Sequence, residues 1–127
     1  MKLRLCLILL VTLTMLSCFG DSAADTVQDF HKNIESGQLE AAMKLLSNST
    51  RSQIPADKLK QSLQMLTREI DEKGGIKKFE ITEEKEIGEI ANVSVKITFG
   101  DGSEETSESS LIKEDGKWRI QLTAGAK

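Results

Sequence analysis

Hydrophobic positions recur with a helical period through the first half of the chain. A first helix is predicted by the apolar positions Ala23, Val27, Phe30 and Ile34. Ser36-Gly37 is a stop signal after it, and a second, shorter helix has the apolar face Leu39, Ala42, Met43 and Leu46. The polar run 47–50 breaks that helix. A third, longer helix begins at Ser52 or Asp57 and ends at Gly74-Gly75, with the apolar face Leu59, Leu63, Leu66 and Ile70.

After Gly75 the period changes from helical to alternating. Phe79 and Ile81 point one way along a first strand, and a second strand alternates strictly over 91–99. Gly100-Asp101-Gly102 predicts a hairpin turn, 104–114 the returning strand, and Asp115-Gly116 a second turn. The last strand alternates Trp118, Ile120 and Leu122 with polar residues. Helices followed by an antiparallel meander predict an α+β fold in which the helices cover the apolar face of the sheet.

The start of the chain is typical of an export signal. Lys2 and Arg4 precede an apolar stretch from Cys6 to Leu16, which is too short to cross a bilayer as a helix. The stretch ends in Ser17-Cys18. This ending resembles the lipobox of bacterial lipoproteins, in which the cysteine is lipidated and becomes the new N-terminus. The alternative is an ordinary secretory signal that is cleaved near Ala23-Ala24, so that Cys18 is discarded.

The lipoprotein interpretation divides the chain into three parts and sets its location. Residues 1–17 are the signal peptide, 18–24 the lipidated N-terminus and a polar tether, and 25–124 a single domain. Cys18 is the expected lipidation site, so the mature protein is attached to the membrane of the bacterial cell envelope. The resemblance to lipoproteins of diderm bacteria favours the periplasmic side of the outer membrane, because Phe19 rather than Asp follows Cys18.

Composition narrows the range of chemistry. The formal net charge of −3 at pH 7 argues against nucleic-acid binding. The chain has one His and no Tyr, and no spacing of a zinc site, phosphate loop or nucleophile elbow is present. His31 follows Phe30 and is placed at the rim of the apolar face of the first helix. We expect a protein that is not an enzyme and that holds neither a cofactor nor a metal.

The overall pattern resembles a known family. It combines Cys18, a first helix with Phe30, the turn 35–38 and the terminal segment 114–120. These features resemble the bacterial lipoproteins of domain of unknown function 4878, a lumazine-binding-like family of the nuclear-transport-factor-2-like, cystatin-like superfamily. The resemblance implies a curved antiparallel sheet wrapped around helices as a cone, often with a pocket at the open end and often dimeric through the sheet. Known isomerases of this superfamily use a Tyr, which this chain lacks.

The candidate pocket follows from that implied cone. Its expected lining comes from apolar residues of the second and third helices and of the sheet: Met43, Leu63, Phe79 and Trp118. Trp118 is interpreted first as a core residue and, alternatively, as a pocket wall. We expect a non-catalytic envelope lipoprotein that binds a small apolar ligand, a peptide or an envelope protein. The alternatives are a small isomerase- or hydrolase-type enzyme that uses His31 with a nearby acid, and a dimerising spacer without a ligand.

Overall fold

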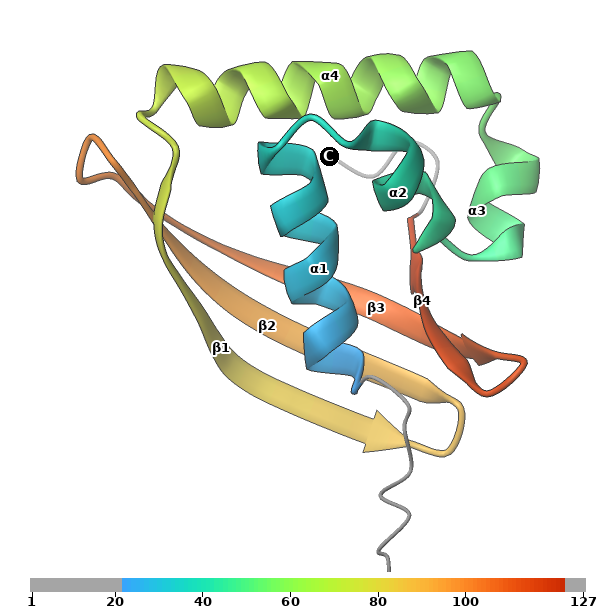
Figure 1. The fold of residues 1–127 in the computed structure, drawn as a ribbon. Coiled ribbons are helices and arrows are strands. Elements are labelled where there is room, and N and C mark those ends of the chain that lie inside the picture. The colour runs from blue at the N-terminus through green and yellow to red at the C-terminus, as the bar shows by residue number, and fades with distance from the viewer. Residues whose placement is uncertain (1–21, 123–127) are drawn as a thin grey trace, which may run out of the picture.

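The computed structural model describes residues 22–122, and within these residues four helices precede four strands (Figure 1). The helices are α1 (Ala23–Glu35), α2 (Leu39–Lys44), α3 (Asn48–Gln53) and α4 (Ala56–Glu72). The strands are β1 (Ile76–Ile87), β2 (Ile90–Phe99), β3 (Glu104–Glu114) and β4 (Lys117–Gln121).

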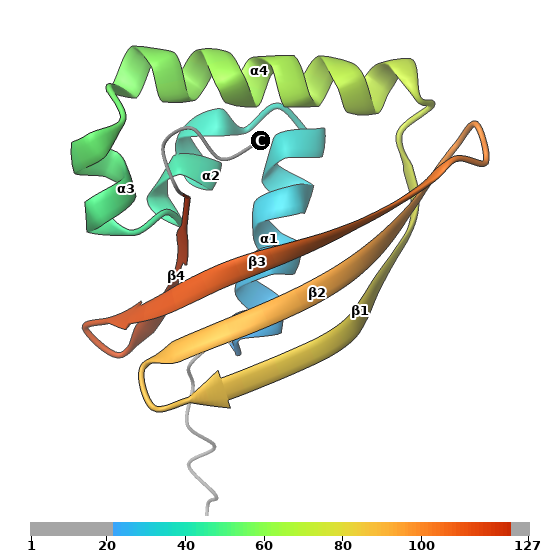
Figure 2. The ribbon, with the colours of Figure 1, turned by 180° about the vertical axis from the view of Figure 1, so that it is seen from behind.

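The strands form one antiparallel sheet in the order β1-β2-β3-β4. The sheet is curved, α1 lies against its concave face, and α4 crosses beyond the C-terminal end of α1 (Figures 1 and 2). This arrangement confirms the predicted α+β class, with N-terminal helices packed on a curved antiparallel sheet.

Apolar side chains fill the space between α1 and the sheet. The strict alternation predicted for 91–99 is present in β2, where every second residue is buried. α1 contributes the other half of this core, because its apolar face points into the curve of the sheet. The largest fully buried hydrophobic side chains are Val27, Ile34, Leu46, Val93, Val95, Leu111 and Ile120. The interior of the cone is therefore a packed core.

The polar segment after α2 differs from the prediction. The residues 47–50 were expected only to break a helix, yet the short helix α3 begins at Asn48. The Ser47 hydroxyl caps this helix by accepting from the Thr50 backbone N–H at 3.1 Å. Both side chains are buried, and the Ser47 hydroxyl also donates to Thr50 Oγ1 at 2.9 Å. Residues 22–122 thus contain four helices where the periodicity predicted three.

α1 begins at Ala23, the first apolar position of the predicted helix, so the expected tether overlaps the helix. Residues 22–24 were assigned to a polar tether, but Ser22 caps α1 and forms a reciprocal capping box with Asp25. Ala23 is fully buried. The folded part of the chain therefore begins no later than Ser22, a few residues before the expected domain boundary.

A β-bulge changes the alternation along β1. Phe79 and Ile81 stand opposite the buried Ile97 and Val95, as the alternating pattern predicts. The register shifts between Ile81 and Glu83, so that Glu84 then stands opposite the buried Val93. Facing inward, the Glu84 carboxylate accepts from the Ala24 backbone N–H at 2.7 Å. This bond ties the first turn of α1, where an acid is favoured by the helix dipole, to the sheet.

The two edges of the sheet differ. At the β4 edge, Ile120 forms a parallel bridge with Leu46. The Ile120 N–H donates to the Leu45 carbonyl, and its own carbonyl accepts from the Ser47 N–H, both at 2.8 Å. In the described residues no chain segment pairs with β1 on its outer side. The outer side of β4 is therefore covered by backbone at Ile120, whereas no described segment covers β1.

Candidate functional site

An apolar hollow lies between α1 and α4, and we name it the α1–α4 hollow. Its volume is about 360 Å³. It is lined by Phe30, Leu59, Ser62, Leu63, Met65, Leu66, Glu69 and Leu122. Six of these eight residues are apolar. The two polar ones, Ser62 and Glu69, are about two turns apart on the same helix. The site resembles a ligand pocket in composition, since such pockets combine an apolar lining with few polar groups.

The apolar lining of this hollow reaches the surface. Leu63 is buried at its floor, whereas Met65 is 63% exposed at its mouth. Large apolar side chains are usually removed from water, so an accessible group of them marks a surface that gains by being covered. At the rim, Glu69 Oε1 lies 3.2 Å from Lys73 Nζ. This ion pair keeps the Glu69 charge directed toward solvent and the Lys73 side chain. The arrangement can hold an apolar molecule but offers no reactive group to it.

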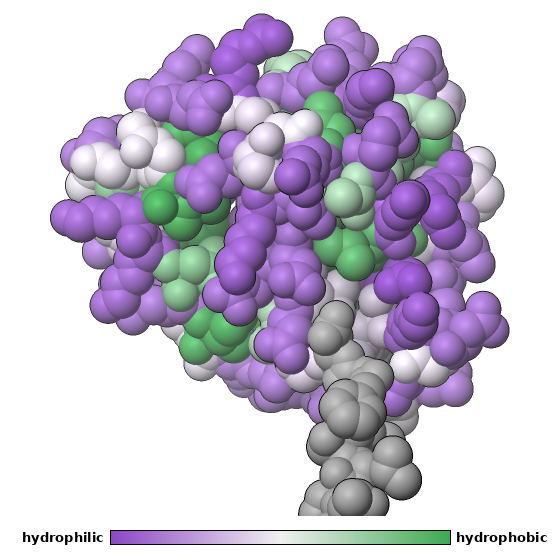
Figure 3. Space-filling view, in the orientation of Figure 1, coloured by the Kyte–Doolittle hydropathy of each residue, from purple (hydrophilic) through white to green (hydrophobic). Residues whose placement is uncertain are grey.

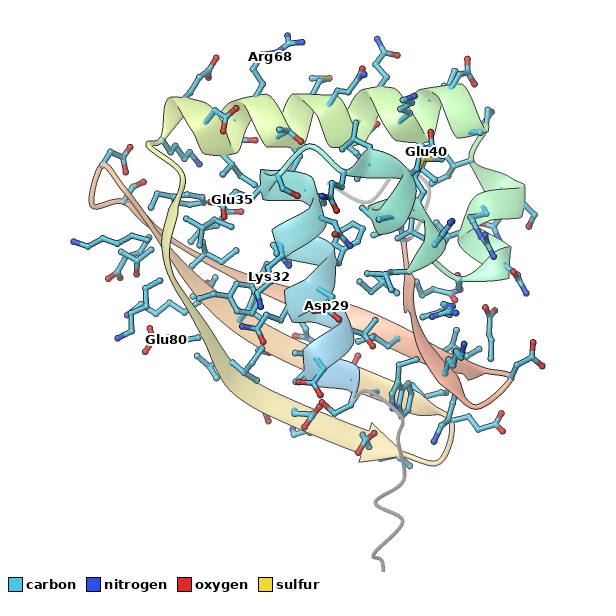
Figure 4. The ribbon with its side chains drawn as sticks, viewed as in Figure 1. Asp29, Lys32, Glu35, Glu40, Arg68 and Glu80 are labelled. Carbon is cyan, nitrogen blue, oxygen red and sulfur yellow. The ribbon has the colours of Figure 1, made fainter. Side chains whose placement is uncertain are left out.

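A second hollow of about 200 Å³ lies between α1 and β1. We name it the α1–β1 hollow. It is lined by Gln28, His31, Lys32, Glu35, Ile76, Lys77, Lys78 and Phe79. Lys32 and Glu35 leave α1 on the side that faces β1 (Figure 4), and hydrophobic atoms are visible beside α1 over β1 (Figure 3).

His31 is held in one orientation in this second hollow. Its Nδ1 lies 2.9 Å from the Val27 carbonyl oxygen, which can only accept a hydrogen bond. The proton is therefore on Nδ1, and Nε2 carries the lone pair. The ring meets Phe30 edge-on at 5.9 Å between centroids and lies 5.1 Å from the Phe79 ring. Burial lowers the pKa of His31, against the opposing effects of the Val27 hydrogen bond and the charge of Glu105.

The one acid among the residues that line this hollow is already engaged. Glu35 Oε2 accepts a hydrogen bond from the Ile76 backbone N–H, which fixes the start of β1 against the end of α1. No hydrogen bond in the described residues joins His31 to a carboxylate. An imidazole and a carboxylate therefore share one hollow without forming the coupled pair that general acid–base chemistry commonly uses.

A third hollow, of about 420 Å³, is more polar and lies between the turn after α1 and the outer part of α4. It is lined by Gly37, Leu39, Gln64, Thr67, Arg68 and Asp71. The Arg68 side chain points away from the rest of the molecule (Figure 4). Thr67 is engaged with the backbone, since its hydroxyl lies 2.7 Å from the Ile34 carbonyl oxygen. This hollow has no convergent group of side chains.

The four residues expected to line one pocket lie in different places. Leu63 belongs to the α1–α4 hollow, and Phe79 belongs to the α1–β1 hollow. Met43 is half-buried against the core, and Trp118 is buried in β4. Met43 and Trp118 line none of these three hollows. The core between α1 and the sheet separates the positions that the sequence analysis grouped together.

Two residues of the α1–α4 hollow were not expected there. Phe30 was assigned to a helix face that packs on the core, and Leu122 was assigned to the buried face of the last strand. The helical spacing of Leu59, Leu63 and Leu66 did identify one wall of the hollow. The signal that was missing is long-range: nothing in a local period places the end of β4 beside α4.

Cys18 and the expected signal segment lie outside the described residues. Within residues 22–122, no helix is long and apolar enough to cross a membrane. The same residues contain no group of three or more His, Cys, Asp or Glu side chains that could bind a metal ion.

Solved structures with a similar fold span most of the chain. A protein of Campylobacter jejuni described as a candidate NTF2-like transpeptidase is 23% identical, with a TM-score of 0.73 over 81% of this chain and 100% of its own. A de novo designed NTF2-fold protein is 19% identical, with a TM-score of 0.58 over 81% of this chain and 86% of its own. A SEC-C motif containing protein of Rhodopseudomonas palustris is 16% identical, with a TM-score of 0.56 over 80% of this chain and 79% of its own.

These identities are low, so the first two structures establish the NTF2-like fold and leave the activity open. No curated protein sequence gives a significant match. The sequence itself matches one family over residues 16–121, which includes every described helix and strand. The chain therefore belongs to the family described as Domain of unknown function (DUF4878), and it has the NTF2-like fold.

Proposed function

We propose that this protein is a non-catalytic binding protein that takes up a small apolar molecule in the α1–α4 hollow. The observation that carries the proposal is the lining of that hollow, in which six apolar side chains surround about 360 Å³. This volume lies within the range of about 300–1,000 Å³ that is usual for small-molecule sites. The lining provides only Ser62 and Glu69 for orienting a polar group, so a mainly hydrocarbon ligand fits it better than a sugar or a nucleotide.

The proposal is tested by changing the mouth of the hollow without disturbing its floor. Leu66 lies at the rim, and Leu66→Arg places a charged side chain over the opening. Gln64→Arg is the matched control, because Gln64 is exposed on the same helix but lies outside this hollow. The probe is N-phenyl-1-naphthylamine, which fluoresces when it enters an apolar site. We expect saturable binding to the wild type and to Gln64→Arg, and markedly weaker binding to Leu66→Arg.

Equal probe binding by all three proteins would contradict the proposal. Native mass spectrometry of the protein purified from the cells that make it gives an independent measurement, because a retained ligand adds its mass to the folded chain. That added mass is expected to be lost from Leu66→Arg and kept by Gln64→Arg.

We further propose that the protein acts at the surface of a membrane, attached by a lipid on Cys18. This part rests on Ser17-Cys18 at the end of the apolar leader and on the membership of a family that matches from residue 16 onward. Two or more acyl chains give stable attachment, because each buried methylene contributes about 0.8 kcal/mol. Cys18→Ser should release the protein from the membrane fraction, and unchanged fractionation would refute the attachment.

A second candidate function is favoured by the α1–β1 hollow. Because burial lowers the pKa of His31, its imidazole is neutral near pH 7. Nδ1 donates to the Val27 carbonyl oxygen, so the lone pair is on Nε2. Glu35 lines the same hollow. A small isomerase- or hydrolase-type reaction would use this pair. His31→Gln distinguishes the two functions: the binding protein keeps its biological activity in a complementation assay, whereas the enzyme loses it while remaining folded and lipidated.

A further inference from the structure

The end of the β1–β2 hairpin carries an exposed row of isoleucines. Ile87 and Ile90 are 81% and 59% exposed, and they face each other across the turn. Ile90 is also the cross-strand partner of the half-buried Ile112 in β3. Residues directly opposite each other share one face of a sheet. Ile87, Ile90 and Ile112 therefore form a continuous apolar strip across three strands, which we name the isoleucine row.

This row lies on the outer face of the sheet, away from the core. Ala91, the next residue after Ile90, is buried on the inner side, so Ile90 points outward. Single exposed hydrophobic side chains are common, but a row of adjacent β-branched ones at a hairpin tip leaves a contiguous apolar surface in water. Covering this surface with an apolar partner is favourable, because it removes the isoleucine side chains from water.

The row is at the same end of the molecule as the start of α1 (Figures 1 and 2). The 2.7 Å hydrogen bond from the Ala24 N–H to Glu84 joins the first turn of α1 to β1. Glu84 precedes Ile87 by three residues, which is about 10 Å along a strand. Ser22, where the described chain begins, is therefore close to the isoleucine row. The opposite end of the sheet is farther from Ser22 by the length of β1.

The length of the chain between Cys18 and Ser22 limits the distance from a lipid to this end. Four residues span at most about 14 Å even when fully extended. We propose that the isoleucine row contacts the headgroup region of the bilayer that holds the lipid of Cys18, so that the protein sits on the membrane in one fixed orientation. This inference rests on the proposed lipid attachment and adds to it the surface that faces the membrane.

The charges around the row specify the kind of membrane surface that it fits. Glu86 and Glu89 flank the tip, and two bases lie on the same face as the row: Lys85, two residues before Ile87, and Arg119, the cross-strand partner of Ile112. Lys85 is itself paired with Glu83 at 2.9 Å. Acids and bases are therefore mixed around the row, which gives no one-sided attraction to anionic headgroups. The contact therefore favours a zwitterionic surface, and it is shallow, because the carboxylates remain in water while the isoleucines enter.

The test places a fluorescent reporter at each end of the lipidated protein. Glu89→Cys carries a nitrobenzoxadiazole label at the tip, and Glu72→Cys carries it at the far end of α4. Because the thiol of Cys18 is consumed by the lipid, the introduced cysteine is the labelled one. Each protein is reconstituted into phosphatidylcholine vesicles that contain a nitroxide-labelled lipid as quencher. We expect several-fold stronger quenching and bluer emission at position 89 than at position 72.

Two variants separate the row from the anchor. Replacing both Ile87 and Ile90 with Ser is expected to remove the excess quenching at position 89 while the protein still floats with the vesicles. Met65→Ser, which changes an apolar residue on α4 that is 63% exposed against 59% for Ile90, is expected to leave the quenching at position 89 unchanged.

Each outcome has a distinct meaning. Equal quenching at positions 89 and 72 in a floating protein overturns the membrane contact while the lipid attachment stands. Excess quenching that survives the double Ser variant also overturns it. If the unaltered protein fails to float, the attachment through Cys18 fails, and the contact proposed here falls with it.

Discussion

Replacing Trp118 with Ala tests whether the last strand holds the sheet to its core. Trp118 is 4% exposed and stands beside Lys113, whose Nζ lies 5.3 Å from the centre of the indole ring. A buried aromatic side chain removes about 150–250 Å² from water, which at about 25 cal/mol per Å² corresponds to about 4–6 kcal/mol. Alanine retains part of this, so the expected loss is about 3–5 kcal/mol, as for other large aromatic truncations.

That loss is a large part of the stability of a domain of this size, which is commonly about 5–15 kcal/mol. The assay is urea unfolding followed by far-UV circular dichroism, because the variant lacks the single Trp of the chain and gives no indole fluorescence. Ile87→Ala is the control, since Ile87 is 81% exposed, and its cost should stay within about 0.5 kcal/mol. If Trp118→Ala unfolds at the same urea concentration as the wild type, the conclusion that the Trp118 side chain is buried is refuted.

Two further changes test the turns and the buried histidine. Gly100→Ala is expected to destabilise strongly, because a Cβ there would overlap the Gly74 carbonyl oxygen and lie 2.9 Å from its carbonyl carbon. The melting temperature reports it, and a value equal to that of the wild type contradicts it. Because burial lowers the pKa of His31 below 6.5, the unfolded chain takes up its proton first as the pH falls, so this part of the stability is present above pH 6.5 and is lost below it. Melting temperatures between pH 7.5 and 5.5 should therefore fall less steeply for His31→Gln, and parallel profiles would contradict the assignment.

The fold was predictable where a local period coincides with burial. The spacing of Val27, Phe30 and Ile34 identified α1, and the alternation through 91–99 identified β2 and its buried face. In both elements one face meets the core along its whole length, so sequence period and structural period agree. The helices-first order then gives the layer arrangement, because an apolar sheet face needs a cover.

The errors arose where long-range contacts decide the local structure. Ser47 and Thr50 are polar and predict a break, yet their hydroxyls bond to each other, and Thr50 also accepts from the Leu122 N–H at 2.9 Å. That partner is far away in the sequence, so a local window cannot detect it. The inward turn of Glu84 likewise depends on a bulge, which shifts the alternation of β1 by one residue.

The candidate site was less predictable than the fold. A cone was expected to enclose one pocket, but Leu63 and Phe79 line separate hollows because core side chains occupy the space between α1 and the sheet. Whether a concave sheet is filled or open depends on how closely its helix approaches. That distance is set by side-chain volumes across many contacts, and composition and spacing alone do not give it.

The difference between the two sheet edges limits how copies of this protein could assemble. In the described residues, backbone pairs with β4 on its outer side only at Ile120, residues 104–109 of β3 extend past β4 without a partner there, and no segment pairs with β1 on its outer side. A strand that pairs with its own copy about a two-fold axis uses the same edge in both molecules. In such a pair, β1 of each copy is no longer an open edge. The backbone contact that Leu45 and Ser47 make with Ile120 then covers part of β4 at either end of the joined sheet.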